Sequence, residues 1–99
     1  MASFSIEVTE QAKVDLARYT ASVRKKIVAE IRKQLAHQPH VETKNRKSLR
    51  ANPIATWELR AGRHRVFYEV DVPANSVCII AIGHKDHDVL LIRGQEVEL

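Results

Sequence analysis

The stretch ATWELRAGRHRVFYEVDVPANSVCIIAIG, residues 55–83, decides the fold of this chain. Its first two parts, 55–61 and 65–71, alternate apolar and polar residues, which is the period of a strand with one buried face. Its last part, 76–83, is a nearly continuous run of β-branched and other apolar residues, typical of a central strand. Short turns at 61–63 and 73–75 join the three strands as hairpins. The stretch therefore predicts the body of an antiparallel sheet.

The chain before this stretch begins with a strand and a helix. Phe4, Ile6 and Val8 alternate with polar neighbours, which indicates a strand with one buried face. Thr9 stands where a helix N-cap belongs, and apolar residues keep a helical spacing to about Thr20. A first strand followed directly by a first helix is the expected start of the fold.

A second helix is predicted over residues 23–35, where apolar side chains recur every four positions and basic ones occupy the other faces. It ends before Pro39. Residues 38–54 are predicted to be a polar loop with a short extended piece around Ser48 and Leu49. The predicted fold class is α+β in the order β-α-α-β-β-β, with a two-helix hairpin (about 10–37) packed on an antiparallel sheet. Residues 89–92 fit either a further strand or a helical turn.

Length and composition predict a single domain over residues 1–99. The chain has 99 residues, 44% hydrophobic and 28% charged, which is enough for one core and no more. Its longest apolar run, 77–82, is far shorter than the roughly 20 residues of a membrane-spanning helix. The first ten residues lack a signal-peptide pattern, and Cys78 is the single cysteine. We therefore expect a cytoplasmic, reducing setting and no membrane partner.

Positive charge is concentrated in one part of the chain. The whole chain carries a net charge of +4, whereas residues 44–65 alone hold seven Lys or Arg residues and one acid, Glu58, for a net +6. Clustered cations attract polyanions and steer association, so this segment predicts a nucleic acid or an acidic peptide as partner. A solvated basic face without a partner is the alternative.

Charged residues are expected to converge on one face of the predicted sheet. The helices cover one face, so residues that end the strands can line a cleft on the other. The expected members are Glu58, Arg60, Arg65, His84, Lys85 and His87. Arginine binds phosphate through two parallel hydrogen bonds, lysine offsets developing charge, and histidine moves a proton near neutral pH. This set is equipped for phosphodiester chemistry without a metal or cofactor.

Three other features of the sequence have plainer explanations. Residues 84–88 hold ligand-type side chains at short spacing, but no distant Cys or His completes a metal site, so none is predicted. Cys78 lies inside an apolar strand and is predicted to be a small hydrophobic side chain. Trp57 and Tyr68 lie on alternating strands and are predicted to be core residues.

An ordered series of motifs runs along nearly the whole chain. It comprises the Leu-x-x-x-Pro of residues 35–39, Lys47 with Leu49, Trp57-Glu58-Leu59-Arg60, Gly62, the Arg-Val-Phe-Tyr-Glu-Val of 65–70 and the Ile-Gly-His-Lys of 82–85. This series resembles the RelE/ParE superfamily, the toxins of type II toxin–antitoxin systems. The specific part is Leu-Arg, Gly, Arg-Val-x-Tyr and Gly-His-Lys in that order.

The resemblance implies roles for individual residues. In the ribonuclease branch of the superfamily, the positions of Arg65 and Lys85 line the mRNA phosphate and that of His84 donates a proton to the leaving oxygen. Glu58 is either the base that takes the 2′-hydroxyl proton or a half-exposed structural partner of Arg60 or Arg65. Further phosphate contacts are expected from Lys44, Lys47, Arg60, Arg63 and His87.

The resemblance also implies partners and an activity. It implies a cognate antitoxin whose acidic or amphipathic tail covers the basic segment, mRNA on the ribosome, and operator DNA only through the antitoxin complex. The implied activity is ribosome-assisted, metal-independent mRNA cleavage. A DNA gyrase inhibitor and a catalytically silent antitoxin-binding member stay open, because the scaffold is shared. The chain also departs from many ribosome-dependent members by having Thr56 and Glu58 on the second strand, and no Tyr in residues 89–93.

Overall fold

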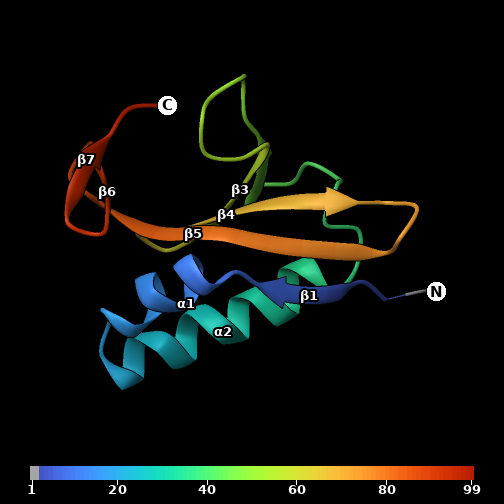
Figure 1. The fold of residues 1–99 in the computed structure, drawn as a ribbon, viewed down its shortest axis with the longest axis horizontal. Coiled ribbons are helices and arrows are strands. Elements are labelled where there is room, and N and C mark those ends of the chain that lie inside the picture. The colour runs from blue at the N-terminus through green and yellow to red at the C-terminus, as the bar shows by residue number, and fades with distance from the viewer. Residues whose placement is uncertain (1–2) are drawn as a thin grey trace.

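A computed structural model describes residues 3–99 as two helices packed on one curved sheet (Figure 1). The elements, in chain order, are β1 (Ser5–Val8), α1 (Glu10–Ala17), α2 (Ala21–Leu35), β2 (Arg46–Ser48), β3 (Trp57–Ala61), β4 (His64–Asp71), β5 (Ser76–Asp86), β6 (Val89–Ile92) and β7 (Gln95–Val97). The predicted α+β class, the helical hairpin and the central strand β5 are confirmed. No helix within residues 3–99 is long and apolar enough to cross a membrane.

Both helices begin at threonine caps. The Thr9 hydroxyl accepts a hydrogen bond from the amide of Ala12, as its position in the sequence predicts, and Thr20 caps α2 through the amide of Val23. The apolar stripe of α2 is buried against the sheet through Ile27, Ile31 and Leu35. The stripe therefore fixes which side of α2 faces the sheet and leaves its basic residues outside.

The sheet order is β2-β3-β4-β5-β6-β7, with every one of these pairs antiparallel. β1 departs from the predicted antiparallel sheet because it pairs with β5 in parallel, with Ser5 opposite Ser76 and Val8 opposite Ile79. Alternating residues predict a strand but do not identify its partner, and here the partner is about seventy residues away along the chain. The wholly antiparallel expectation is corrected at this one strand.

The end of the chain forms two further strands. Residues 89–92, which fit a strand or a helical turn, are β6, and β7 follows after a turn in which Arg93 and Gly94 have φ angles of 54° and 75°. Gly83 allows β6 to lie close, because a Cβ at this position would overlap the carbonyl oxygen of Leu91. The glycine of the Gly-His-Lys motif therefore has a packing reason.

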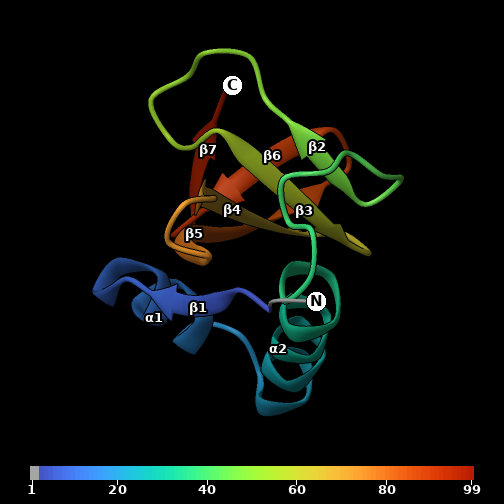
Figure 2. The same ribbon diagram turned by 90° about the vertical axis from the view of Figure 1, so that its right-hand side faces the viewer.

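The sheet separates two hydrophobic cores. On the helix side, residues of α1 and α2 pack against Leu59, Val66, Tyr68 and others, and Trp57 is partly buried there with its ring stacked on Tyr68 at 6.1 Å between centroids. The far side is concave (Figure 2) and holds a smaller core of Ala55, Phe67, Ala81, Leu90 and Ile92. The face opposite the helices is therefore partly covered by the end of the chain, whereas the sequence predicted it to be free.

Candidate functional site

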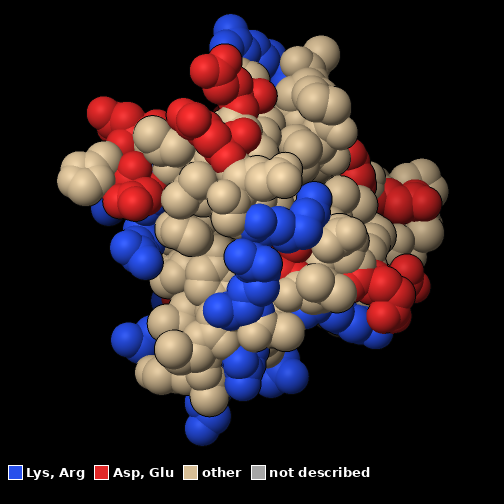
Figure 3. Space-filling model, turned by 60° about the vertical axis from the view of Figure 1, so that its left-hand side comes forward, with Lys and Arg blue, Asp and Glu red and all other residues tan. Residues whose placement is uncertain are grey.

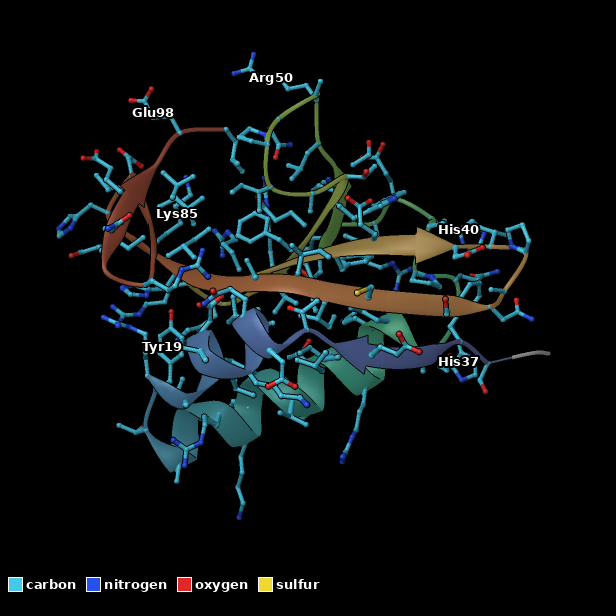
Figure 4. All side chains as sticks on the ribbon, in the orientation of Figure 1. Tyr19, His37, His40, Arg50, Lys85 and Glu98 are labelled. Carbon is cyan, nitrogen blue, oxygen red and sulfur yellow. The ribbon has the colours of Figure 1, made fainter. Side chains whose placement is uncertain are left out.

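The predicted site residues are divided between the two faces of the sheet. Successive residues of a strand point to opposite faces, so His84 and Lys85 on β5 cannot line the same cleft. Figure 4 shows Tyr19, the hydrogen-bond partner of His84, on the helix side of β5 and Lys85 on the other. The expected convergence of His84 with Lys85 and Arg65 is therefore not found.

A pocket on the concave side brings together Glu58 and Lys85. It encloses about 360 Å³ between the sheet and the end of the chain. We call it the concave pocket; its lining residues are Glu58, Lys85, Asp88, Leu90, Val97, Glu98 and Leu99. The chain end that forms one wall is held to the loop before β3, because Arg50 donates to the carbonyl oxygen of Leu99 at 3.2 Å. Two predicted catalytic residues therefore share one cavity.

Glu58 is held in place by two arginines. Its side chain is 8% exposed, and its Oε1 accepts a hydrogen bond from Arg60 Nε at 2.9 Å and lies 3.5 Å from Arg65 Nε. No hydrogen bond to Oε2 is found among residues 3–99. The sequence predicted a partly exposed Glu58 paired with Arg60 or Arg65, whereas it is nearly buried and contacts both. Oε2 is thus the oxygen left for a ligand in the concave pocket.

Arg65 lies behind Glu58 and does not line the pocket. Its Nη1 donates to the carbonyl oxygens of Gly62 at 2.7 Å and His64 at 2.9 Å. Its Nε is buried without a well-aligned hydrogen bond, although the carboxylate of Glu58 lies within ion-pair distance. Burial lowers the pKa of Arg65, and the charge of Glu58 opposes that shift. In this geometry Arg65 supports the position and charge of Glu58.

His84 belongs to a second cluster, on the helix side. The Tyr19 hydroxyl lies 2.8 Å from His84 Nδ1, and the Tyr19 ring meets the rings of His64 and His84 edge-on at 5.4 and 5.6 Å. Burial and the nearby charge of Arg63 lower the pKa of both histidines. Burial also raises the pKa of Tyr19. At neutral pH this cluster therefore holds uncharged imidazoles against an uncharged phenol.

The expected phosphate-binding residues are spread over several places. Lys47 on β2 lies opposite Glu58 on β3. Arg60, which contacts Glu58, has a half-exposed side chain. Lys44 and Arg63 are exposed in loops, and His87 is exposed at the turn after β5, next to Asp86. Figure 3 shows Lys and Arg side chains in a column over one face, from the sheet down to the helices. The expected phosphate-binding residues therefore lie on several elements and do not close around one point.

The structural role of Asp15 was not predicted from the sequence. The fully buried carboxylate of Asp15 accepts from the amide of Ile82 at 3.1 Å and from Arg93 Nη1 at 2.8 Å. The amide of Ile82 lies between the part of β5 that pairs with β1 and the part that pairs with β6, so Asp15 supplies an acceptor where this edge of β5 has no neighbouring strand. An acid on the apolar side of a predicted helix was the available signal. Asp15 therefore ties α1 to the strand that carries Lys85 and to the end of the chain.

No group of three or more His, Cys, Asp or Glu side chains is placed to hold a metal ion within residues 3–99. The His-rich segment 84–88 is divided by the strand geometry: His84 bonds Tyr19, and His87 bonds Asp86 at the exposed turn. The titratable side chains that line the concave pocket are Glu58, Lys85, Asp88 and Glu98.

Comparison with known proteins gives the family. No curated protein sequence matches the chain. A toxin–antitoxin complex, RelBE2 from Mycobacterium tuberculosis, contains a chain similar in structure at 24% identity and a TM-score of 0.75, over 86% of this chain and 94% of that one. The archaeal RelE–RelB complex from Pyrococcus horikoshii OT3 gives 18% identity and a TM-score of 0.68, over 88% and 99%. A family model described as the ParE toxin of type II toxin–antitoxin systems, parDE, matches residues 6–89. The chain therefore belongs to this toxin family, within the RelE/ParE superfamily.

Proposed function

We propose that this toxin inhibits translation by cutting mRNA at the concave pocket, with Glu58 and Lys85 as its catalytic residues. The observation that carries the proposal is the shared cavity, in which a carboxylate and a lysine face the same space of about 360 Å³. The carboxylate can accept a proton and the lysine ammonium can donate one. Cleavage of RNA by attack of its own 2′-hydroxyl on the adjacent phosphate requires both steps.

The proposed reaction uses the RNA's own nucleophile. Glu58 Oε2 takes the proton of a 2′-hydroxyl, whose oxygen attacks the adjacent phosphorus. The bond from phosphorus to the 5′ oxygen breaks, and that oxygen takes a proton from the Lys85 ammonium. The products are a 2′,3′-cyclic phosphate and a free 5′-hydroxyl. Glu58 then gives its proton to water and the neutral Lys85 amine takes one from water, which restores both groups. Lys85 also offsets the charge that develops on the phosphate oxygens.

The two arginines that contact Glu58 prepare it for this role. Arg60 and Arg65 both contact Oε1, so the carboxylate is oriented with Oε2 free. Orientation of a base before the reaction lowers the entropy cost of reaching the transition state. Lys47, opposite Glu58 on β2, adds positive charge beside the path that an RNA strand would take. His84 has no part in this proposal, because it lies on the helix side.

The proposed partners follow from the family and from the basic surface. A cognate antitoxin holds the toxin inactive, mRNA is bound on the ribosome, and operator DNA is reached only through the antitoxin complex. One similar solved structure is described as a toxin–antitoxin complex, and the other as a RelE–RelB complex. We place the protein in the cytoplasm, where these partners are found.

A DNA gyrase inhibitor is the second candidate. The observation that favours it is the match over residues 6–89 to a family model named after ParE toxins. A protein that binds gyrase needs no proton donor in a pocket, and the helix-side position of His84 is compatible with that function.

Primer extension on translated mRNA after brief induction separates the candidates. The ribonuclease proposal expects new 5′ ends at fixed codon positions. If the mRNA stays intact and stabilised gyrase–DNA breaks appear with an SOS response, the protein is a gyrase inhibitor and the ribonuclease proposal is wrong. If neither new 5′ ends nor gyrase–DNA breaks appear, the ribonuclease proposal is wrong, whether or not the cells stop growing. Normal growth in that case would be explained by a catalytically silent member that only binds its antitoxin.

A further inference from the structure

Two histidines lie side by side where β4 begins and β5 nears its end. His64 is directly opposite His84 in the antiparallel register. The amide of Lys85 donates to the carbonyl oxygen of Arg63 at 2.8 Å, and this bond makes His64 and His84 a non-hydrogen-bonded pair of the ladder. In such a pair the Cα atoms are only about 4.5 Å apart and the side chains are at their closest. The two imidazoles therefore leave the sheet as neighbours.

Both imidazoles are on the helix side of the sheet. Val66, two residues after His64, belongs to the core that the helices cover. Ile82, two residues before His84, belongs to the same core, and residues two apart on a strand share a face. Tyr19, just after α1, meets both rings edge-on. Both histidines are only half-buried, so a small solute can reach them from the solvent.

One ring nitrogen of each histidine already has a partner. Nδ1 of His84 lies 2.8 Å from the Tyr19 hydroxyl, and His64 has a hydrogen bond with the backbone of Ala61. In the tautomer with its proton on Nδ1, His84 donates to Tyr19 and its Nε2 keeps a free lone pair. Histidines that bind metal ions are usually held in this way, with one nitrogen for the ion and the other on a group of the protein.

The chemistry of the pair suits a metal ion of the borderline class. The ordinary histidine pKa of 6.5 leaves most imidazoles uncharged at neutral pH, and the uncharged ring is the form that binds metals. Imidazole is a good ligand for Zn²⁺, Ni²⁺ and Cu²⁺ and a poor one for Mg²⁺ or Ca²⁺. The charges of Arg63 and Arg65 oppose a cation, whereas that of Asp86 favours one. The ligand is therefore expected to be a divalent transition-metal ion held mainly by the two rings.

We propose that His64 and His84 form a two-histidine binding site for a divalent transition-metal ion such as Zn²⁺, with Tyr19 as a positioning residue. One nitrogen of each ring binds the ion, and water completes its coordination. Residues 84–88 hold ligand-type side chains but no distant histidine to complete a site, and the register of β4 and β5 supplies that histidine. The site is on the opposite face of the sheet from the concave pocket, so it does not depend on the ribonuclease proposal.

A Zn²⁺ titration of the EDTA-treated protein tests the site. NMR follows the ring-nitrogen signals of the five histidines. We expect the signals of His64 and His84 to move together, at a lower Zn²⁺ concentration than those of the exposed histidines. The exposed ones are His37, His40 and His87. Cu²⁺ should bind more tightly than Zn²⁺ to the same pair.

Substitutions separate binding by the pair from binding by single histidines. His64→Gln and His84→Gln should each weaken Zn²⁺ binding about 10²-fold, because the remaining ring loses its fixed neighbour. The control is the double variant His37→Gln with His40→Gln, which also removes histidines but at the other end of the sheet from Tyr19 (Figure 4). Its affinity for Zn²⁺ should equal that of the parent protein.

Tyr19→Phe tests the positioning role. It keeps the ring and removes the hydroxyl that holds Nδ1 of His84, so Zn²⁺ binding should weaken about tenfold. A merely structural role of Tyr19 would change the free energy of unfolding without Zn²⁺ and leave the affinity unchanged. Arg63→Gln removes an opposing charge and should strengthen Zn²⁺ binding about 2–10-fold.

Three results would overturn the metal-site proposal. They are signals of His64 and His84 that stay still, signals that move only together with those of the exposed histidines, and parental affinity in folded His64→Gln or His84→Gln protein. Circular dichroism checks the folding of each variant, and the titration of the parent protein decides the first two results without any variant. Inorganic phosphate that moves the signals of the pair when Zn²⁺ does not would assign the cluster to an anion instead.

Discussion

The hydroxyl of Tyr19 lies 2.8 Å from Nδ1 of His84 and fixes this imidazole on the helix side of β5. Burial and the charge of Arg63 lower the pKa of His84, so its imidazole is mainly uncharged near neutral pH, and its tautomer decides whether Tyr19 or Nδ1 donates the hydrogen bond. The next residue, Lys85, must then point into the concave pocket. The alternation of side chains along β5 thus separates two neighbours that the sequence analysis placed in one site.

The histidine cluster predicts a loss of stability in mild acid. The ordinary pKa of histidine is 6.5, and those of His64 and His84 are lower in the folded protein. Below the ordinary value the unfolded chain takes up protons that the folded chain does not, so the free energy of unfolding falls as pH falls. Urea denaturation at a series of pH values between about 7 and 5 measures this slope.

A double variant isolates the contribution of the two histidines. His64→Gln with His84→Gln removes both titrating rings, so the slope between about pH 7 and 5 should become flatter. Both proteins keep Arg63, which lowers the pKa of His84, and Asp86, which raises it, so the two proteins differ only in the histidine rings. An unchanged slope would assign the acid sensitivity to other titratable groups and contradict this role of His64 and His84.

Gly83 should tolerate no side chain. A Cβ there would overlap the carbonyl oxygen of Leu91 and lie 2.8 Å from Cγ1 of Ile92, so Gly83→Ala should force β6 away and cost about 1–3 kcal/mol. Gly62→Ala is the comparison, because the space beside Gly62 is open and only its φ of 61° is unfavourable, at a cost of about 1 kcal/mol. Urea denaturation of both variants checks this order, and an equal or reversed order contradicts the packing explanation.

The Asp15 carboxylate should support the end of the chain. Asp15→Ala leaves the amide of Ile82 without its acceptor and Arg93 without its ion pair, at an expected cost of about 2–4 kcal/mol. Asp15→Asn keeps an acceptor for the amide and should cost less. Hydrogen exchange at β6 and β7 measures the local part of the effect, and exchange that stays as slow as in the parent protein would contradict this role.

Much of the fold could be predicted because it depends on short-range patterns. The alternation in 55–61 and 65–71, the continuous apolar run of β5 and the cap at Thr9 each predict an element correctly. The parallel pairing of β1 could not be predicted, since nothing local selects β5 as its partner. Residues 89–92 stayed open and β7 was not predicted, because both strands are short and their turn depends on a non-glycine residue, Arg93, with positive φ.

The candidate site was predicted less well, for a reason visible in the sequence. The residue types Glu58, Arg65 and Lys85 were selected by charge and motif, and they do lie on one side of the sheet. Because adjacent residues of a strand point to opposite faces, the sequence also predicts that His84 and Lys85 lie on opposite sides of the sheet. The family resemblance nevertheless placed both residues in one site. Tyr19 and Asp15 could not be assigned, because their roles depend on contacts with residues far along the chain.

Glu58→Gln tests the proposed base. The amide keeps an oxygen for Arg60 and nearly the same shape, but it cannot take a proton, so mRNA cleavage should fall about 10²–10⁴-fold. Folding should be retained, as circular dichroism and the emission of the single tryptophan can confirm. If the folded Glu58→Gln protein cuts mRNA at the parent rate, Glu58 has only a structural role.

The most direct measurement compares codon-positioned cleavage of translated mRNA by Lys85→Ala and by His84→Gln. Lys85 lines the concave pocket and His84 does not, although they are neighbours in the chain. The concave-pocket mechanism predicts that Lys85→Ala lowers the cleavage rate about 10²–10³-fold, as for loss of one preorganised donor, and that His84→Gln leaves it nearly unchanged. Full cleavage by folded Lys85→Ala, together with loss of cleavage in His84→Gln, would contradict it and move the reaction to the helix side of the sheet.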